Sequence, residues 1–241
     1  MHLGVSAFIG LLAAGVVFVL WFPSPFDTLA AGTQIFMLMI WIDLVAGPAL
    51  TLVVADPAKP KHELRRDLAL IAGFQVCVLA YGLYVAGQAR PVLLAFEVDR
   101  FRIVSAAEID PTTLPDAPAD MPTLLWTGPQ LIAAVKPTDP VQAFRSVQLG
   151  MAGIDLSMDP RNWRPYATQA AAAWHAAKPL QGLLQRFPVV APEAGEIASA
   201  IAKPVGSLRY LPVQSRRMVW VAVLAEPGAK IVGYLPVDGF N

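Results

Sequence analysis

The chain has 241 residues, a formal net charge of zero, 56% hydrophobic residues and only 15% charged residues. This charge balance excludes the strongly basic surface of a typical nucleic-acid-binding protein, so no nucleic acid is expected as a partner. Because Cys77 is the only cysteine, the sequence also excludes an intramolecular disulfide and a cysteine-based metal site.

The first 89 residues contain three long apolar stretches. Segments 3–26 and 68–89 contain no Asp, Glu, Lys or Arg, and segment 28–55 contains only Asp43. A helix needs about 20 apolar residues to cross a bilayer. The sequence therefore predicts an integral membrane protein. Its transmembrane helices are expected at about 3–22, 29–55 and 66–89.

The second apolar stretch contains an unusual polar segment. Asp43 is followed by Gly47, Pro48 and Thr51, and a carboxylate inside a bilayer is costly unless it is neutral, paired or close to water. Pro48 removes one backbone hydrogen bond and is expected to kink the helix. Three interpretations stay open for Asp43: a neutral carboxyl bonded to a polar side chain of the third helix such as Gln75, a contact with a partner's transmembrane helix, or proton transfer.

The loop between the second and third helices, residues 56–65, sets the orientation. Residues 56–67 contain four Lys or Arg residues, whereas residues 23–28 contain none. Because short cytoplasmic loops are enriched in Lys and Arg, residues 56–65 are predicted to be cytoplasmic. The N-terminus is then also cytoplasmic, and residues 90–241 lie in the periplasm. This predicts a multi-pass protein of the bacterial inner membrane.

Residues 90–241 have the composition of an ordinary soluble domain, with fourteen basic and thirteen acidic residues. Apolar residues alternate over 92–104, as in a β-strand, and the alternation shifts at Asp99 and Arg100, which predicts a bulge or a tight bend. Ser105 and Glu108 match a capping box, which predicts a short helix.

Helices are expected in the middle of this domain and strands at its end. The helices are predicted at 138–151, 159–178, 180–186 and 193–202. Strand-like segments are found at 209–213, 218–224 and 230–235, with a turn at 226–229. The predicted fold is therefore three N-terminal transmembrane α-helices followed by a small periplasmic α+β domain with an antiparallel C-terminal meander.

Candidates for acid–base chemistry are few. Glu97 and Asp99 lie two residues apart on a predicted strand and could share a face, but Arg100 and Arg102 flank them, which indicates a charged strand face rather than a catalytic pair. The three histidines are far apart in the sequence, and no Gly-rich phosphate loop is present. Trp126 is expected to anchor a packed turn. The sequence predicts no enzyme, no metal and no cofactor.

Several segments together match the pattern of a known family. They are IDLVAGPALTLVV at 42–54, LRRDLALI at 64–71, the segment 89–101 with FEVDRF at its end, and the turn WTGP at 126–129. They resemble the TfpX/TfpZ family of type IV pilin accessory proteins, most densely over 40–109. The resemblance implies an inner-membrane protein that supports production or assembly of a cognate type IV pilin as a dedicated chaperone. It carries over no catalytic residue.

The resemblance also implies where a pilin would bind. A pilin has an apolar N-terminal helix in the membrane and a periplasmic head, so the three-helix region is expected to shelter the helix within the lipid bilayer while the α+β domain contacts the head. No feature of the sequence indicates an oligomeric state. The residues expected to bind the partner are Asp43, Gly47, Pro48, Thr51, Arg90, Glu97, Asp99 and Arg100.

Two other classes of function stay open beside a pilin accessory protein. A membrane sensor or regulator would bind a periplasmic ligand, but the predicted cytoplasmic side offers only the 56–65 loop and a short N-terminus, so it would need another protein for output. A membrane enzyme acting at the outer leaflet would depend on Glu97 and Asp99. The accessory protein is the preferred interpretation.

Overall fold

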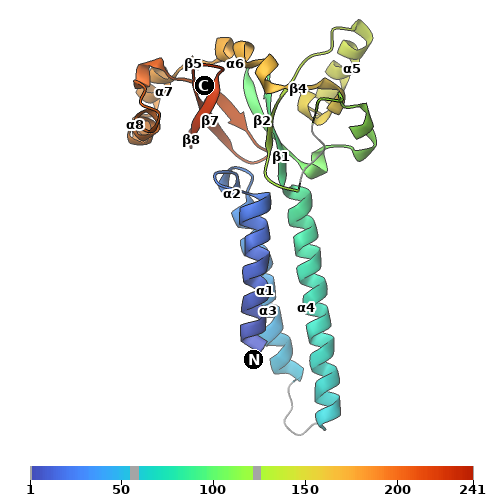
Figure 1. Cartoon of the computed structure of the whole chain (residues 1–241). Coiled ribbons are helices and arrows are strands. Elements are labelled where there is room, and N and C mark those ends of the chain that lie inside the picture. The colour runs from blue at the N-terminus through green and yellow to red at the C-terminus, as the bar shows by residue number, and fades with distance from the viewer. Residues whose placement is uncertain (1, 55–59, 122–125, 241) are drawn as a thin grey trace. The chain divides into compact units, whose positions relative to one another are not determined.

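The computed structural model describes residues 2–54, 60–121 and 126–240. The chain divides into two compact units, Met1–Arg90 and Pro91–Asn241. Figure 1 shows the order of the elements, helical in the first unit and mixed in the second.

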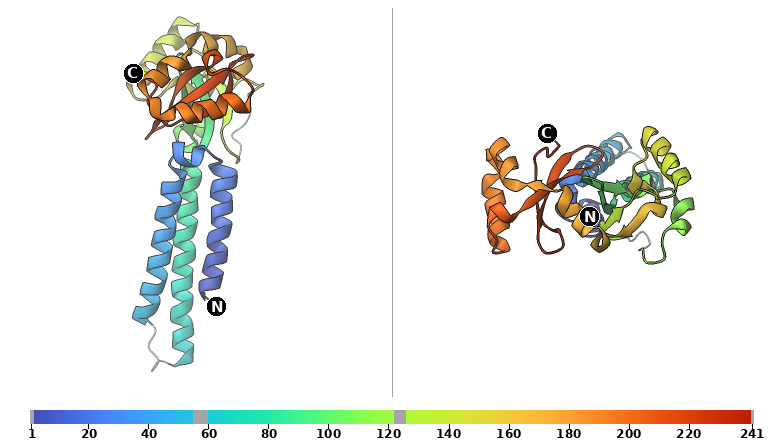
Figure 2. Two further views of the ribbon diagram at one scale, coloured as in Figure 1. Left: turned by 90° about the vertical axis from the view of Figure 1, so that its left-hand side faces the viewer. Right: turned by 90° about the horizontal axis from the view of Figure 1, so that it is seen from above.

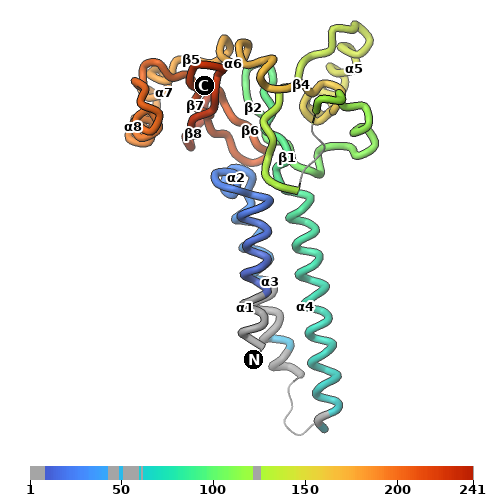
Figure 3. Tube along the Cα trace, in the orientation of Figure 1, coloured from blue at the N-terminus to red at the C-terminus, as the bar shows by residue number. Residues whose placement is uncertain are grey.

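The first unit is helical. Helix α1 (His2–Gly15) continues into a π-helical segment, η1 (Val16–Trp21). The short helix α2 (Phe26–Leu29) precedes α3 (Gly32–Val54), and α4 (Lys61–Ala89) follows. The three long helices run side by side (Figure 3). They pack through a cluster of buried side chains formed by Ala13, Val17, Trp21, Phe22, Phe36, Met39 and Ala86.

The predicted helix over 29–55 begins three residues too early, because α2 ends at Leu29 and α3 begins at Gly32. Ala31 has a left-handed backbone conformation with a φ of 61°, and a right-handed helix cannot continue through such a residue. The next residue, Gly32, allows close packing, since a Cβ there would lie 2.6 Å from the ring of Phe22. The chain therefore turns at Ala31, and α3 begins at Gly32.

Residues 56–59 of the predicted loop lie outside the described residues, and the third long helix begins at Lys61, earlier than the predicted range 66–89. The carbonyl oxygen of Pro60 accepts hydrogen bonds from the backbone N–H groups of Glu63 (3.0 Å) and Leu64 (3.1 Å). The residues that follow include Lys, Glu, Leu and Arg, which favour helix, and α4 extends for 29 residues. Lys61 and Arg65 therefore belong to a helix rather than to a loop.

Among the described residues, one helix is long and apolar enough to cross a membrane. The segment His62–Ala89 of α4 is long and apolar enough to cross a membrane, whereas the apolar segments Ile9–Trp21 and Gly32–Ile42 are shorter. The sequence predicts three such helices, so the described part of the chain supports one of them. α4 exposes large side chains such as Leu70 and Phe74 (66% and 53%). Such a surface is unfavourable in water and suits lipid.

The second unit is an α+β domain, and its described residues form one mixed sheet of eight strands. The strand order is β4-β3-β1-β2-β6-β7-β8, with β5 paired to β6. β6, β7 and β8 pair antiparallel in chain order, so the predicted C-terminal meander is confirmed. β1 pairs parallel with β3, and β2 pairs parallel with β6. The strands are β1 Pro91–Glu97, β2 Arg100–Ser105, β3 Gln130–Ala134, β4 Trp163–Pro165, β5 Lys178–Pro179, β6 Arg209–Gln214, β7 Val219–Ala225 and β8 Lys230–Leu235.

Two hydrophobic clusters form the core of this unit. Helices α7 (Leu180–Arg186) and α8 (Ala191–Ala200) lie against the C-terminal strands (Figure 2), where Leu183 of α7 packs with Tyr210 of β6 and Val223 of β7. The second cluster surrounds β1 and β3 and includes Leu93, Ile132 and Trp163. Helices α5 (Pro140–Met151) and α6 (Ala170–Ala176) complete the unit. The expected helix at 180–186 is confirmed with the same bounds, and those at 138–151 and 193–202 are confirmed with shifted ends.

The prediction of a helix over 159–178 is wrong for most of that range. Trp163 lies in β4, which pairs antiparallel with β3, and its side chain is completely buried. Its indole Nε1 donates a hydrogen bond of 2.7 Å to the carbonyl oxygen of Ser157. Pro165 ends this strand, and α6 is the α-helix that remains, with short 3-10 turns at Pro160–Asn162 and Tyr166–Thr168. Burial of the indole and strand pairing therefore outweigh the helix propensity of the alanines.

Candidate functional site

Four residues predicted to bind a partner lie in α3. Asp43, Gly47, Pro48 and Thr51 belong to its helical backbone, but their side chains lie outside the described residues. The three interpretations of Asp43 therefore stay predictions.

Arg90 follows the last residue of α4. Its guanidinium Nη1 donates a hydrogen bond to the carbonyl oxygen of Gly87. Carbonyl groups in the last turn of a helix have no partner within the helix, and a basic side chain there satisfies one of them. This contact gives Arg90 a part in ending the helix.

Glu97, Asp99 and Arg100 lie at the tight bend that joins β1 to β2, where the sequence predicts a bend. Val98 has a φ of 50°, and the N–H of Asp99 donates to the carbonyl oxygen of Glu97, which makes a three-residue γ-turn. The side chain of Asp99 is 66% exposed, whereas Glu97 is only 3% exposed. The two carboxylates differ in exposure, yet both lie beside the guanidinium of Arg100, which is 3.7 Å from Oε2 of Glu97 and 3.8 Å from Oδ1 of Asp99.

Arg102 of β2 is the centre of a charge network. Its Nε donates to Oδ2 of Asp155 over 2.8 Å, and its Nη2 donates to Oε1 of Glu108 over 3.0 Å. Oε2 of Glu108 accepts from the N–H and the Oγ of Ser105 at 2.7 and 2.8 Å, which confirms the predicted capping box. Arg102 is 6% exposed. Charge-assisted hydrogen bonds of this kind are strong, so the network joins three chain segments.

Glu97 is held beside this network. Its Oε1 accepts from the backbone N–H of Ser157 over 2.7 Å, and its Oε2 lies 3.7 Å from Nη2 of Arg100. Burial raises the pKa of Glu97 above its ordinary value; the hydrogen bonding from Ser157 and the charge of Arg100 oppose this rise, and the nearby Asp155 adds to it. The carboxyl is therefore engaged by protein donors rather than open to a substrate.

The network also fixes the segment that contains α5. Before α5, the N–H of Val135 donates to the carbonyl oxygen of Asn162 over 2.9 Å. After α5, Asp155 and Ser157 are bound by the network. Residues 136–154 therefore leave the sheet and return to it at two fixed points.

Two features of this unit differ from what the sequence predicts. The network was missed, although Arg102 between the apolar Phe101 and Ile103 is a signal that a buried guanidinium needs carboxylates. The prediction that Trp126 anchors a packed turn is wrong, since its side chain is 69% exposed. In the parts of the chain that the structure describes, no group of three His, Cys, Asp or Glu side chains could hold a metal ion.

The chain is similar to proteins of fimbrial assembly. A family model described as fimbrial assembly protein FimB matches residues 1–31. The fimbrial assembly protein of Dichelobacter nodosus serogroup I is 29% identical over 246 residues, covering 100% of this chain and 94% of that protein. The serogroup E1 protein is 28% identical over 245 residues with the same coverage. The protein of serogroups C1 and C2 is 35% identical over 117 residues, covering 48% of this chain and 89% of that protein.

The chain belongs to the family of fimbrial assembly proteins. The full-length similarity to relatives of this family extends over both structural units. The matched residues 1–31 lie outside the segments that carry the resemblance to pilin accessory proteins, so a second part of the chain independently indicates fimbrial assembly. No solved structure matches the chain.

Proposed function

We propose that the chain is a dedicated accessory protein of type IV fimbria biogenesis, which binds and stabilises the fimbrial subunit, a type IV pilin, at the bacterial inner membrane. The observation that supports this function is the full-length similarity to fimbrial assembly proteins. The resemblance to the TfpX/TfpZ family supplies the finer role of chaperone.

The first unit offers surfaces for an apolar helix of the subunit. Leu38 and Trp41 of α3 are 65% and 62% exposed, and Tyr81 and Tyr84 of α4 are 69% and 62% exposed. Within a bilayer, helices associate through close packing and interhelical hydrogen bonds. The proposed contact therefore combines these exposed side chains with the polar segment of α3 around Asp43.

The proposal includes three membrane crossings. α1 and η1 together run from His2 to Trp21, and α3 has 23 residues. At 1.5 Å per residue α3 is about 34 Å long, and α1 with η1 has about the 20 residues that cross the hydrocarbon core of a bilayer. With the basic residues around 56–65 in the cytoplasm, the α+β unit would lie in the periplasm.

Alkaline phosphatase fusions test this topology. A fusion after Asn241 is expected to be active, because the enzyme requires export, and a fusion within 56–60 is expected to be inactive. Immunoblots control for equal amounts of the two fusions. An inactive C-terminal fusion at normal expression would overturn the proposed topology.

The proposed function contains no catalytic step. The carboxyl of Glu97 is buried and bonded to the N–H of Ser157, while Asp99 is exposed in the turn. These are the two carboxylates that an enzyme at this position would need. Both lie within 4 Å of the guanidinium of Arg100, and their pairing with this cation supports a binding role.

Deletion of the gene tests the function itself. The deletion is expected to lower the amount of fimbrial subunit and to abolish surface fimbriae, and the wild-type gene is expected to restore both. Tagged full-length protein purified from detergent-solubilised membranes should retain the subunit, and an unrelated tagged inner-membrane protein should not. Normal fimbriae in the deletion strain would contradict the proposal.

A further inference from the structure

Helix α5 carries its large apolar side chains outward. Val141, Phe144, Val147 and Met151 are 77%, 66%, 61% and 86% exposed. Their spacing of three or four residues places them on one face of the helix. The opposite face carries the half-buried residues Ser146 and Leu149. The polarity of α5 is thus inverted, with the more apolar face away from its own domain.

α5 is held at its ends rather than by packing. None of its twelve residues is buried, and a helix of this length is only marginally stable alone in water. At its start, Oδ1 of Asp139 accepts from the N–H of Gln142 over 2.9 Å, and beyond its end the charge network holds Asp155. Figure 1 shows α5 at the end of the second unit opposite α7 and α8. The helix is therefore held at both ends by hydrogen bonds, and its apolar face is exposed.

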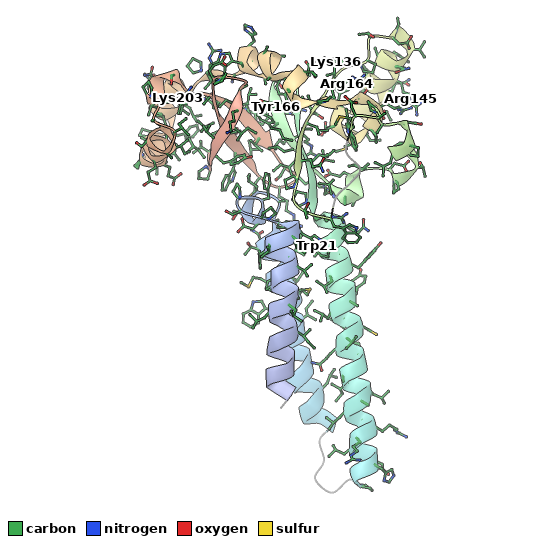
Figure 4. All side chains as sticks on the ribbon, viewed as in Figure 1. Trp21, Lys136, Arg145, Arg164, Tyr166 and Lys203 are labelled. Carbon is green, nitrogen blue, oxygen red and sulfur yellow. The ribbon has the colours of Figure 1, made fainter. Side chains whose placement is uncertain are left out.

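Three exposed cations belong to α5 or to the part of the sheet from which the chain enters it. Arg145 belongs to α5, Lys136 precedes the helix, and Arg164 of β4 pairs with Ala133 of β3 (Figure 4). All three are exposed, and no ion pair formed among the described residues includes them. Asp159 attracts Arg145 at longer range, but α5 itself contains no acidic residue. The surface therefore favours a partner that combines apolar side chains with carboxylates.

We propose that the α5 face, meaning Val141, Phe144, Val147 and Met151, together with the exposed cations Lys136, Arg145 and Arg164, docks an acidic, partly apolar segment of the head of the fimbrial subunit. The inference rests on the proposed function, because it takes the fimbrial subunit as the partner. Apolar side chains of that segment cover the four exposed side chains of α5, and its carboxylates pair with the three cations.

Charge and size argue for this occupant over a second copy of the chain. Two copies joined through the same face would bring the three cations of each against those of the other. Stable complexes bury about 800 Å² per partner from some 20–30 residues, whereas the apolar part of this face consists of four side chains. A contact of this size can form and release, as delivery of a subunit to a growing filament requires.

Binding of the purified fimbrial subunit to the full-length protein in detergent tests the face. The double variant Phe144→Gln, Val147→Gln is expected to bind at least tenfold more weakly than wild type. Arg145→Glu is expected to weaken binding and to reduce its dependence on salt. Val189→Gln is the matched control, since Val189 is 78% exposed outside α5 and should bind as wild type does. All these side chains are exposed, so thermal unfolding should be unchanged.

Photo-crosslinking in cells identifies the occupant. Phe144 is replaced by p-benzoylphenylalanine in the full-length chain, with the same replacement of Val189 as control. An adduct with the fimbrial subunit at position 144 and none at 189 supports the inference. A dimer of this chain, a lipid adduct or no subunit adduct at 144 overturns it. If wild type and the double variant bind the subunit equally, the α5 face is wrong and the proposed function stands. If wild type does not bind the subunit at all, the proposed function fails as well.

Discussion

Arg102 shows how a guanidinium can occupy the middle of a buried strand. Its neighbours Phe101 and Ile103 are 0% and 3% exposed, so the strand lies inside the domain. A buried charge without a partner is strongly destabilising. Asp155 and Glu108 each accept one of its hydrogen bonds, and the strand can then remain in the core.

Arg102→Met should lower the free energy of unfolding by about 3 kcal/mol, since it leaves buried carboxylates without their cation. The side chains of Glu108 and Asp155 are 11% and 30% exposed, so water compensates Asp155 better than Glu108. Denaturant unfolding of the full-length protein in detergent measures the change. Arg216→Met is the matched control, because Arg216 is 72% exposed and lies 4.0 Å from Glu108. Its effect should stay below about 1 kcal/mol. Equal effects of the two variants would contradict the role of the network.

Glu97→Gln should change how stability depends on pH. Because burial raises the pKa of Glu97, the folded state favours the protonated carboxyl. The stability that this preference contributes is present at acidic pH and is lost as the pH rises through the raised value. Gln cannot ionise, and its amide oxygen can still accept from the N–H of Ser157. The stability of Glu97→Gln relative to wild type should therefore increase from about pH 4 to about pH 8.

Unfolding midpoints across this pH range check the prediction. Asp99→Asn is the matched control, as it removes an exposed carboxyl from the same turn. A stability difference between Glu97→Gln and wild type that does not vary with pH would contradict the effect of burial.

The sequence contains only the local part of this site. The capping box of Ser105 and Glu108 was predicted, because its two residues are three positions apart and follow a strand. Asp155 is 53 positions from Arg102, and only the completed sheet brings the two together. The burial of Glu97 depends in the same way on the distant segment that contains Ser157.

At the scale of elements, helix α4 approaches its neighbours at glycine positions. A Cβ on Gly82 would lie 2.7 Å from Cγ of Met39 in α3, and a Cβ on Gly87 would lie 3.3 Å from the ring of Trp21 in η1. Small residues let membrane helices pack closely. The contact between α3 and α4 thus depends on a missing side chain at Gly82.

Gly82→Val should separate α3 from α4 and lower stability by about 2 kcal/mol, since added methyl groups in a packed interface force the neighbours to move. Gly73→Val is a matched control on the same helix, because a Cβ there meets no atom within 4 Å. Thermal unfolding in detergent compares the two variants. A similar midpoint for Gly82→Val and Gly73→Val would show that α3 and α4 are not packed closely at this position.

Elements set by local chemistry were predicted and elements set by distant contacts were not. α5 begins after Asp139, whose side chain caps the helix. In the meander, the turn residues 226–229 connect β7 to β8. The break before α3 was missed, because Ala31 rather than the neighbouring Gly32 takes the left-handed conformation. The sheet pairing of Trp163 was missed for a similar reason, since β3 lies about 30 positions earlier in the chain.

At the scale of the whole molecule, the second unit contains what it needs to fold. Its two hydrophobic clusters consist of residues between Val92 and Val237, and every strand of its described sheet begins at or after Pro91. About 150 residues are enough to bury a core of their own. The first unit has a separate cluster of buried side chains.

Residues 91–241 produced without the first unit should therefore fold and unfold in one cooperative transition, which near-ultraviolet circular dichroism in denaturant would follow. Arg102→Met should destabilise this fragment by the same amount as the full-length chain, because distant, independent sites act additively. A fragment that lacks a cooperative transition would contradict the independence of the second unit. A fragment that folds but loses the effect of Arg102→Met would mean that the first unit contributes to the charge network. Equal effects would place the network, and the fixed base of α5 that depends on it, within the second unit alone.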